Sequence, residues 1–310
     1  MFPRLALRSA ALLLLLAGTS LADDKPIAGL GPTGPIKKLH GDFKFVEGPA
    51  HDAHGNVYFS DIPNERVHKI DLDGKLTTVR EKTNKANGLM LNAKGEIVAC
   101  EGGAGAVVAY SADGKDRRVI ADKYDGKPFN SPNDLVLDKA GGVYFTDPFF
   151  GKADTKLPQD KMGVYYADAA GKVTRLIDDL PKPNGVILSP DEKTLYVVPS
   201  GQKQMMTYPV ESPGKLGKGK VLCELAQAKQ GGNGGGDGLT VDVKGNLYIT
   251  SGMGLQVFDA VGKPLGAITF PEGPANVTFG GKDMKTLFVT ARTSVYTCPM
   301  EIAGHRFPAK

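Results

Sequence analysis

The sequence predicts an all-β fold, a six-bladed β-propeller with four-stranded antiparallel blades. A short unit recurs six times at intervals of about 40 to 50 residues, the repeat length typical of propeller blades. Each unit consists of two runs rich in Val, Tyr, Phe and Leu, joined by a polar turn that usually contains glycine. Outside the first twenty-odd residues, no stretch shows a convincing amphipathic helical period.

Every unit opens on an acidic or amide residue, and equivalent positions of all blades lie around one axis. These openers are Glu47, Asn87, Asn133, Asn184, Asp237 and Asn276. A second pair of β-rich runs follows, as at residues 163–166 and 173–176, so two hairpins build one blade. An open ring would leave unpaired strand edges. We therefore expect residues 36–39 to complete the last blade beside residues 294–298.

The first 22 residues have the form of a secretory signal peptide. Arg4 and Arg8 precede an apolar core at residues 10–18, and small residues follow at Ser20 and Ala22. We therefore expect a periplasmic or secreted protein. Residues 23–35 are rich in Pro and Gly and are expected to be flexible, and residues 36–310 are expected to form one propeller domain that carries the catalytic site.

Composition narrows the range of partners. The formal net charge of +4 falls to +2 once Arg4 and Arg8 are removed, which gives no reason to expect nucleic acid or, after signal removal, a membrane as partner. Three cysteines, Cys100, Cys223 and Cys298, leave at least one thiol unpaired within a monomer, and their pairing stays open. The oligomeric state also stays open.

The openers indicate the chemistry at the hub of the ring. Glu47, Asn133, Asn184 and Asp237 can present two carboxylates and two amide oxygens at one end of the central channel. Oxygen ligands of this kind suit hard cations. We therefore expect one divalent cation, with Ca²⁺ as first choice and Mg²⁺, Mn²⁺ or Zn²⁺ as alternatives. Such a cation with an open coordination position acts as a Lewis acid.

A longer motif gives a resemblance to a known family. The run Asn130-Ser131-Pro132-Asn133-Asp134, followed by residues 143–148 and Gly151, resembles the gluconolactonase signature of the SMP-30/gluconolactonase/LRE family. Glu47-Gly48-Pro49, Asn184-Gly185 and Asp237-Gly238 are similar to other hallmark positions, and the resemblance covers about residues 40 to 295. It implies a six-bladed propeller that hydrolyses lactones with the help of a metal ion.

The resemblance also implies roles for single residues. Glu47, Asn184 and Asp237 would hold the metal ion, and Asn133 would serve as a further ligand or as an amide that contacts the substrate. Asp237 would also be the catalytic residue that activates water. Asn87 would contact the substrate from the second blade. The resemblance does not identify a residue that donates a proton to the leaving alkoxide.

Two neighbouring features refine these implications. Asp134 and Asp147 repeat the family pattern, and we expect them to cap backbone groups or to support the ligands. Ser131 stands where some sugar-lactone hydrolases of the family have an arginine, which puts a polyhydroxylated sugar lactone in doubt.

Two alternatives to a lactonase stay open. The same site could serve a promiscuous arylesterase or phosphotriesterase, or the propeller could be a non-catalytic protein that binds a ligand. A small-molecule lactone or ester is the expected substrate of the enzyme. A Gly-x-Ser-x-Gly motif is missing from the sequence, which disfavours a serine hydrolase.

Overall fold

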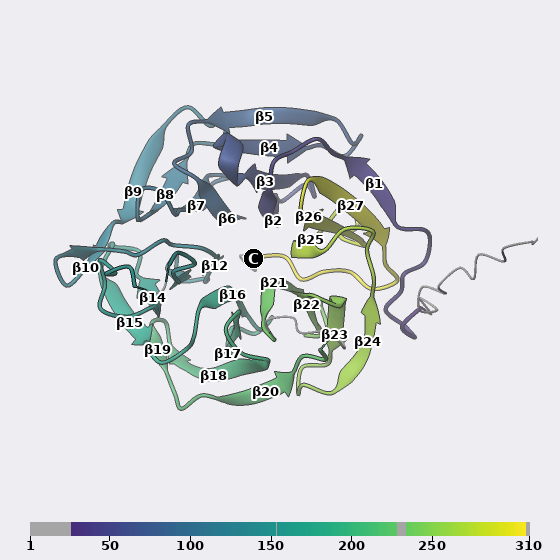
Figure 1. Ribbon diagram of the computed structural model, residues 1–310. Coiled ribbons are helices and arrows are strands. Elements are labelled where there is room, and N and C mark those ends of the chain that lie inside the picture. Colours follow the sequence, from purple (N-terminus) through teal and green to yellow (C-terminus); the bar gives the residue numbers. More distant parts are fainter. Residues whose placement is uncertain (1–25, 153, 228–233, 308–310) are drawn as a thin grey trace, which may run out of the picture.

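The chain forms a six-bladed β-propeller, as the sequence predicts (Figure 1). The structure is a computed structural model that describes residues 26–152, 154–227 and 234–307. The expected signal peptide and residues 23–25 lie outside the described residues. Each blade is an antiparallel sheet whose strands run in sequence order from the central axis outwards, except where the ring closes.

The first three blades each contain four strands. Blade 1 consists of β2 (Val46–His51), β3 (Val57–Asp61), β4 (Arg66–Ile70) and β5 (Leu76–Glu81). Blade 2 consists of β6 (Ala86–Leu91), β7 (Ile97–Glu101), β8 (Ala106–Tyr110) and β9 (Arg117–Ala121). Blade 3 consists of β12 (Leu135–Leu137), β13 (Val143–Asp147), β14 (Gly163–Ala167) and β15 (Val173–Ile177).

The remaining blades follow the same plan with small additions. Blade 4 consists of β16 (Pro183–Leu188), β17 (Thr194–Pro199), β18 (Gln204–Ser212) and β20 (Lys220–Glu224), and β19 (Lys215–Leu216) also pairs with β18. Blade 5 consists of β21 (Gly236–Val241), β22 (Leu247–Ser251), β23 (Gly254–Phe258) and β24 (Pro264–Ile268). Blade 6 consists of β25 (Pro274–Gly280), β26 (Thr286–Ala291), β27 (Ser294–Pro299) and β1 (Lys37–His40). Outside the blades lie η1 (Ile62–Asn64), β10 (Lys123–Tyr124) and β11 (Lys127–Pro128).

Polar turns fix the inner hairpins of the blades. In blade 2, the Asn92 carboxamide oxygen accepts the backbone N–H groups of Lys94 and Glu96 at 2.9 and 3.0 Å. Gly95 completes this turn with a φ of 77°, which glycine adopts without steric cost. Because the turn pins the register, the Val-rich and Leu-rich faces of β6 and β7 enter the core between neighbouring blades.

Burial decreases from the axis outwards. The inner and second strands are mostly buried, and β16 and β13 are buried along their whole length, because both faces pack against neighbouring blades. The outermost strands, such as β5 and β9, expose charged and polar residues at the rim.

The three cysteines are buried in three different hydrophobic clusters of the ring. No helix in the described part of the chain is long and apolar enough to cross a membrane.

The ring closes as the sequence predicts. The N-terminal strand β1 pairs with β27, so the two ends of the chain share blade 6. Residues 26–35 are docked on the same blade, in contrast to the flexible segment expected from their composition. Leu30 is buried in a hydrophobic cluster formed by blades 5 and 6, and its carbonyl accepts the N–H of Glu301 at 2.9 Å. An apolar anchor at Leu30 thus outweighs the flexibility of the surrounding Pro and Gly.

The openers lie at one end of the channel, which we call the mouth. In four blades the residue before the opener pairs with the last residue of the second strand, as Val46 pairs with Asp61. In blade 6 this pair is Pro274 and Ala291, so the opener position is Ala275. The assignment of Asn276 as the sixth opener is therefore wrong by one residue. Asn276 instead takes the next position along the inner strand.

The opposite end of the channel is closed by the C-terminal segment, which runs to the centre of the ring in Figure 1. The N–H of Gly304 donates to the Met284 carbonyl at 2.8 Å, and the N–H of His305 donates to the Val241 carbonyl at 3.0 Å. Phe307 is buried and lines a small cavity of about 40 Å³ inside the channel. The mouth is therefore the open side of the ring.

Candidate metal centre

Three of the four predicted ligands converge at the mouth. The Asn184 amide nitrogen donates one hydrogen bond to the Asp237 carboxylate at 2.6 Å and a second to the Ser200 hydroxyl at 3.0 Å. Glu47 is 4% exposed, and the charge of Asp237 acts on it across the channel. Glu47, Asn184 and Asp237 come from blades 1, 4 and 5. Residues separated by about 190 positions in the chain therefore meet at one point, as the repeat predicts.

Asn87 and Asn133 lie at the mouth with their backbones fixed. The Asn133 carbonyl accepts the N–H of Gly88 at 2.7 Å, and the Asn87 carbonyl accepts the Ser60 hydroxyl at 2.8 Å. Both residues are only half-buried. Among the residues that the structure describes, neither carboxamide makes a hydrogen bond, so both remain available to a ligand. Their assignment to the metal ion or to the substrate stays a prediction.

A second polar layer lies directly beneath the openers. Asp134 and Asn276 occupy the position that is glycine in the other four blades, and their hydrogen-bonded side chains meet in the channel. A Cβ on Gly88 would lie 2.5 Å from an Asp134 carboxylate oxygen, and one on Gly238 would collide with the Asn276 carboxamide. The glycines thus leave the room that these two side chains fill. This layer separates the mouth from the enclosed cavity, which Asp134 and Asn276 also line.

The electrostatics of the site disfavour three negative charges in one buried place. Burial and the charge of Asp237 raise the pKa of Glu47 well above its ordinary value. Hydrogen bonds from the Gly48 N–H and from Asn276 lower this pKa, but by less. Burial and the charge of Asp134 raise the pKa of Asp237 to about 7. Burial raises the pKa of Asp134 to about 7 as well. Without a counter-charge, the three carboxyl groups hold protons at pH values where ordinary carboxylates are ionised.

The residues present fit a hard divalent cation. The Asn184 carboxamide oxygen is buried and has no hydrogen-bond partner among the described residues, although a buried amide oxygen is normally satisfied. In the same part of the chain, Glu47 and Asp237 form no ion pair, and the charge of Arg292 only partly opposes the raised pKa of Asp237. Cations such as Ca²⁺ are bound by mixed carboxylate and carboxamide oxygens. Among the described residues, no three His, Cys, Asp or Glu side chains form a metal cage, so the amides are needed to complete a ligand set.

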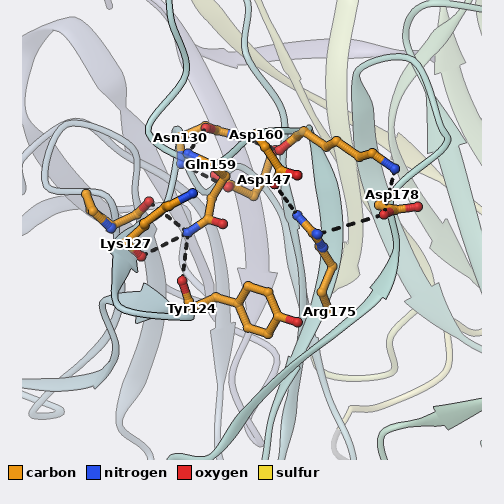
Figure 2. Close-up of polar contacts among 10 residues, drawn as sticks. Tyr124, Lys127, Asn130, Asp147, Gln159, Asp160, Arg175 and Asp178 are labelled. Atoms are coloured by element: carbon orange, nitrogen blue, oxygen red, sulfur yellow. Dashed lines mark hydrogen bonds and ion pairs between the residues drawn. The ribbon is translucent and has the colours of Figure 1, made fainter.

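Blade 3 holds the segment that leads into Asn133. The Asp147 carboxylate accepts the backbone N–H groups of Asn130 and Ser131 at 2.9 and 2.7 Å, which confirms its expected capping role. Figure 2 shows how Gln159, from the loop after β13, reaches the same segment. Its amide nitrogen donates to the Tyr124, Lys127 and Pro128 carbonyls at 2.9 to 3.1 Å. This network fixes the backbone around Asn133 without using the Asn133 side chain.

Asp134 is expected to cap backbone groups or to support the ligands. Its carboxylate accepts the Leu135 N–H at 2.9 Å, and its charge also acts on Glu47 and Asp237. The phase of blade 6 was missed by the sequence-based prediction. A signal for it exists, because proline precedes the openers Asn133 and Asn184 and also Ala275.

Comparisons with known proteins place the chain. A family model described as the SMP-30/gluconolactonase/LRE-like region matches residues 45–293. A gluconolactonase from Zymomonas mobilis is 32% identical over 286 residues, covering 84% of this chain and 80% of the relative. A lactonase drp35 from Staphylococcus saprophyticus is 30% identical over 238 residues, covering 73% and 70% of the two chains.

Solved structures agree with the sequence comparisons. A structure described as a gluconolactonase from Xanthomonas campestris superimposes with a TM-score of 0.78 at 31% identity, covering 86% of this chain and 89% of that chain. A putative gluconolactonase gives a TM-score of 0.80 at 28% identity, covering 91% and 96%. A calcium-binding regucalcin from Agrobacterium tumefaciens, at 22% identity and a TM-score of 0.74, shares the fold. Since the family model spans most of the propeller, the chain belongs to the SMP-30/gluconolactonase/LRE-like family.

Proposed function

We propose that this protein hydrolyses lactones with the help of one divalent cation bound at the mouth. Its similarity to proteins described as gluconolactonases and lactonases supports the reaction class. The convergence of Glu47, Asn184 and Asp237 supports the cation. Ca²⁺ is the first candidate because the proposed ligands are all oxygen atoms.

The proposal rests most directly on the unbalanced charge at the mouth. Glu47 is buried and Asp237 is half-buried, and the charges of Asp237 and Asp134 raise the electrostatic cost of ionising Glu47. Buried carboxylates are normally paired, protonated or bound to metal. Together with the unpartnered Asn184 oxygen, they form a site whose missing component is positive.

The ligands divide into anchors and adaptable groups. Glu47 and Asn184 would hold the ion, because both are buried on inner strands. Asn133 and Asn87 are half-buried, and their carboxamides would contact the ion or the substrate. When bound, the cation would supply Lewis-acid stabilisation for the negative charge that develops on the lactone carbonyl oxygen.

Asp237 has the position of a general base. Its carboxylate is held by the Asn184 amide at 2.6 Å, so one oxygen is fixed while the other can face the mouth. A carboxylate in hydrogen-bond reach of a water molecule can accept its proton as the water attacks the carbonyl carbon. Ring opening then leaves a carboxylic acid and an alkoxide. The alkoxide takes up one proton and Asp237 releases the one that it accepted, so that lactone and water give one hydroxy acid.

The test is hydrolysis of glucono-δ-lactone by the purified protein with and without EDTA. We expect EDTA to abolish turnover and Ca²⁺, Mg²⁺, Mn²⁺ or Zn²⁺ to restore it to different extents. Asp237→Asn should lower kcat by roughly a thousandfold while leaving the circular dichroism spectrum unchanged. Turnover that survives EDTA, or that survives in Asp237→Asn, would contradict the proposal.

The same preparation separates the alternatives. Phenyl acetate and a p-nitrophenyl phosphotriester report an arylesterase or phosphotriesterase on the same site. A non-catalytic propeller would hydrolyse none of the three substrates at any metal concentration. We expect the lactone to be the best substrate, measured by kcat/KM.

A further inference from the structure

Arg292 lies at the mouth on the short turn between β26 and β27 of blade 6. Its φ is 52°, and its carbonyl accepts the N–H of Val46, the residue before Glu47, at 2.9 Å. The turn is therefore fixed against the first blade right beside a proposed ligand. In each blade the second strand ends at the mouth, so the residue that follows β26 stands on the rim of the site.

The side chain of Arg292 turns towards the inner strand of its own blade. A Cβ built on Gly273 would lie 3.8 Å from the Arg292 Nε atom, and Gly273 stands two residues before Ala275. Ala275 is the one opener without a polar side chain. Blade 6 thus contributes a cation to the rim in place of a polar opener.

The guanidinium of Arg292 has no partner in the described part of the chain, and in this it differs from the other described arginines. Each of those makes a hydrogen bond or ion pair: Arg66, Arg80, Arg117, Arg118, Arg175 and Arg306. A carboxylate does lie nearby, on Glu272. Its oxygens are taken by Thr293, Ser294 and Tyr296, the next residues of the turn and of β27. Besides these neutral donors, the Lys38 ammonium lies 3.8 Å from a Glu272 oxygen, so Glu272 has its own partners and Arg292 has no ion pair among the described residues.

We propose that Arg292 binds a carboxylate of the substrate, so that this site prefers lactones carrying a negative charge outside the ring. A guanidinium pairs with a carboxylate through two parallel hydrogen bonds, and its single charge matches that of one carboxylate. The inference rests on the proposed lactone hydrolysis and specifies its substrate class. Blade 6 faces blade 3 across the ring, so Arg292 would hold the substrate from the side opposite Ser131.

A matched pair of substrates tests this inference. D-glucono-1,4-lactone and D-glucaro-1,4-lactone differ in that a hydroxymethyl group is replaced by a carboxylate. We expect the wild-type protein to show a kcat/KM about 10- to 100-fold higher for the glucarolactone, as for one charge-assisted pair. Arg292→Gln should remove this preference mainly by raising KM for the glucarolactone, because only this substrate loses a charged contact.

Two controls separate a specific contact from a general effect. Arg292→Lys keeps the charge and should restore part of the preference, whereas Arg66→Gln removes an equally exposed but ion-paired arginine of blade 1 and should change nothing. Equal kinetics for both lactones in the wild type, or an equal loss for both lactones in Arg292→Gln, would overturn the inference while the proposed hydrolysis stands.

A binding measurement tests the carboxylate site even if the protein hydrolyses neither lactone. Calorimetry with the ring-opened products, D-glucarate and D-gluconate, should show tighter binding of glucarate to the calcium-loaded wild type and no difference in Arg292→Gln. If neither lactone is hydrolysed but this difference is found, the hydrolysis is wrong and the carboxylate site holds. Equal affinities in both proteins would overturn the carboxylate site.

Discussion

Two buried glutamates in neighbouring blades have opposite surroundings. Glu101, at the end of β7, is fully buried. Its carboxylate accepts two hydrogen bonds from the Arg117 guanidinium, at 2.7 and 2.9 Å. It also accepts hydrogen bonds from the Tyr110 hydroxyl at 2.7 Å and from the Asn84 amide at 2.9 Å. Burial raises its pKa, but these donors outweigh burial and leave the pKa below its ordinary value.

Glu47, at the start of blade 1, has no such set of donors. It accepts the Gly48 N–H at 3.0 Å, and the side chain of Asn276 also hydrogen-bonds to it. Its nearest charges are the carboxylates of Asp237 and Asp134, so its pKa is raised. Glu101 is therefore neutralised by a side chain of the protein itself, whereas Glu47 would be neutralised by a bound cation.

The largest effect expected from this comparison concerns Glu47→Gln. Losing a ligand carboxylate should lower kcat/KM for glucono-δ-lactone by roughly a thousandfold or more. The free energy of unfolding in EDTA should stay the same or rise, because a neutral amide replaces a carboxyl group that the folded protein ionises only at a cost. Urea melts and steady-state kinetics check both expectations. A variant that retains more than a tenth of the wild-type activity would remove Glu47 from the site.

The pH dependence of stability comes next in size. Asp237 has a pKa of about 7 in the folded protein against about 4 in the unfolded chain, so its stabilising contribution is complete below pH 4 and lost as the pH rises through 7. For one such group the loss is on the order of 4 kcal/mol. Urea melts in EDTA from pH 4 to 8 should show this decline.

Calcium provides the matching control for the pH series. A bound divalent cation favours the ionised carboxylates, so excess Ca²⁺ should restore most of the stability at pH 8. Flat stability across this range in EDTA would contradict the picture of unbalanced carboxylates. Glu101 should behave in the opposite way, since its stabilising effect is present near neutral pH and lost in acid.

Glu101→Gln should separate stability from activity. Removing the charge leaves Arg117 without its ion pair, which should destabilise the fold by about 3 kcal/mol. The kcat/KM of the folded fraction should stay within about twofold, because Glu101 is already saturated with internal partners. Urea melts and kinetics on the same preparation test this. A loss of activity similar to that of Glu47→Gln would remove the distinction between the two glutamates.

The smallest effect concerns the space left for the second polar layer. Gly238→Ala places a methyl group against the Asn276 carboxamide and should destabilise the protein by about 1 to 3 kcal/mol. Gly252→Ala, on the mouth turn of the same blade, meets no atom within 4 Å and should be neutral. Thermal melts of both variants compare them. Equal melting temperatures would show that Asn276 moves aside freely.

The repeat predicted the ring and the convergence of Glu47, Asn184 and Asp237, because a propeller converts sequence period into angular position. It failed at Ala275, where the opener has no polar side chain to mark it. Burial of Leu30 depends on a surface that forms only when blade 6 closes. Arg292 could not be selected from the sequence, because its importance lies in lacking a partner that the other described arginines have.

Titration calorimetry with Ca²⁺ is the sharpest check on the proposed cation site. We expect one Ca²⁺ per chain for the wild type, with protons released at pH 6 to 7 as Asp237 ionises, and no measurable binding for Glu47→Gln. Glu101→Gln should bind like the wild type. Absence of binding by the wild type, or unchanged binding by Glu47→Gln, would contradict the claim that the fold leaves Glu47 to be balanced by a cation.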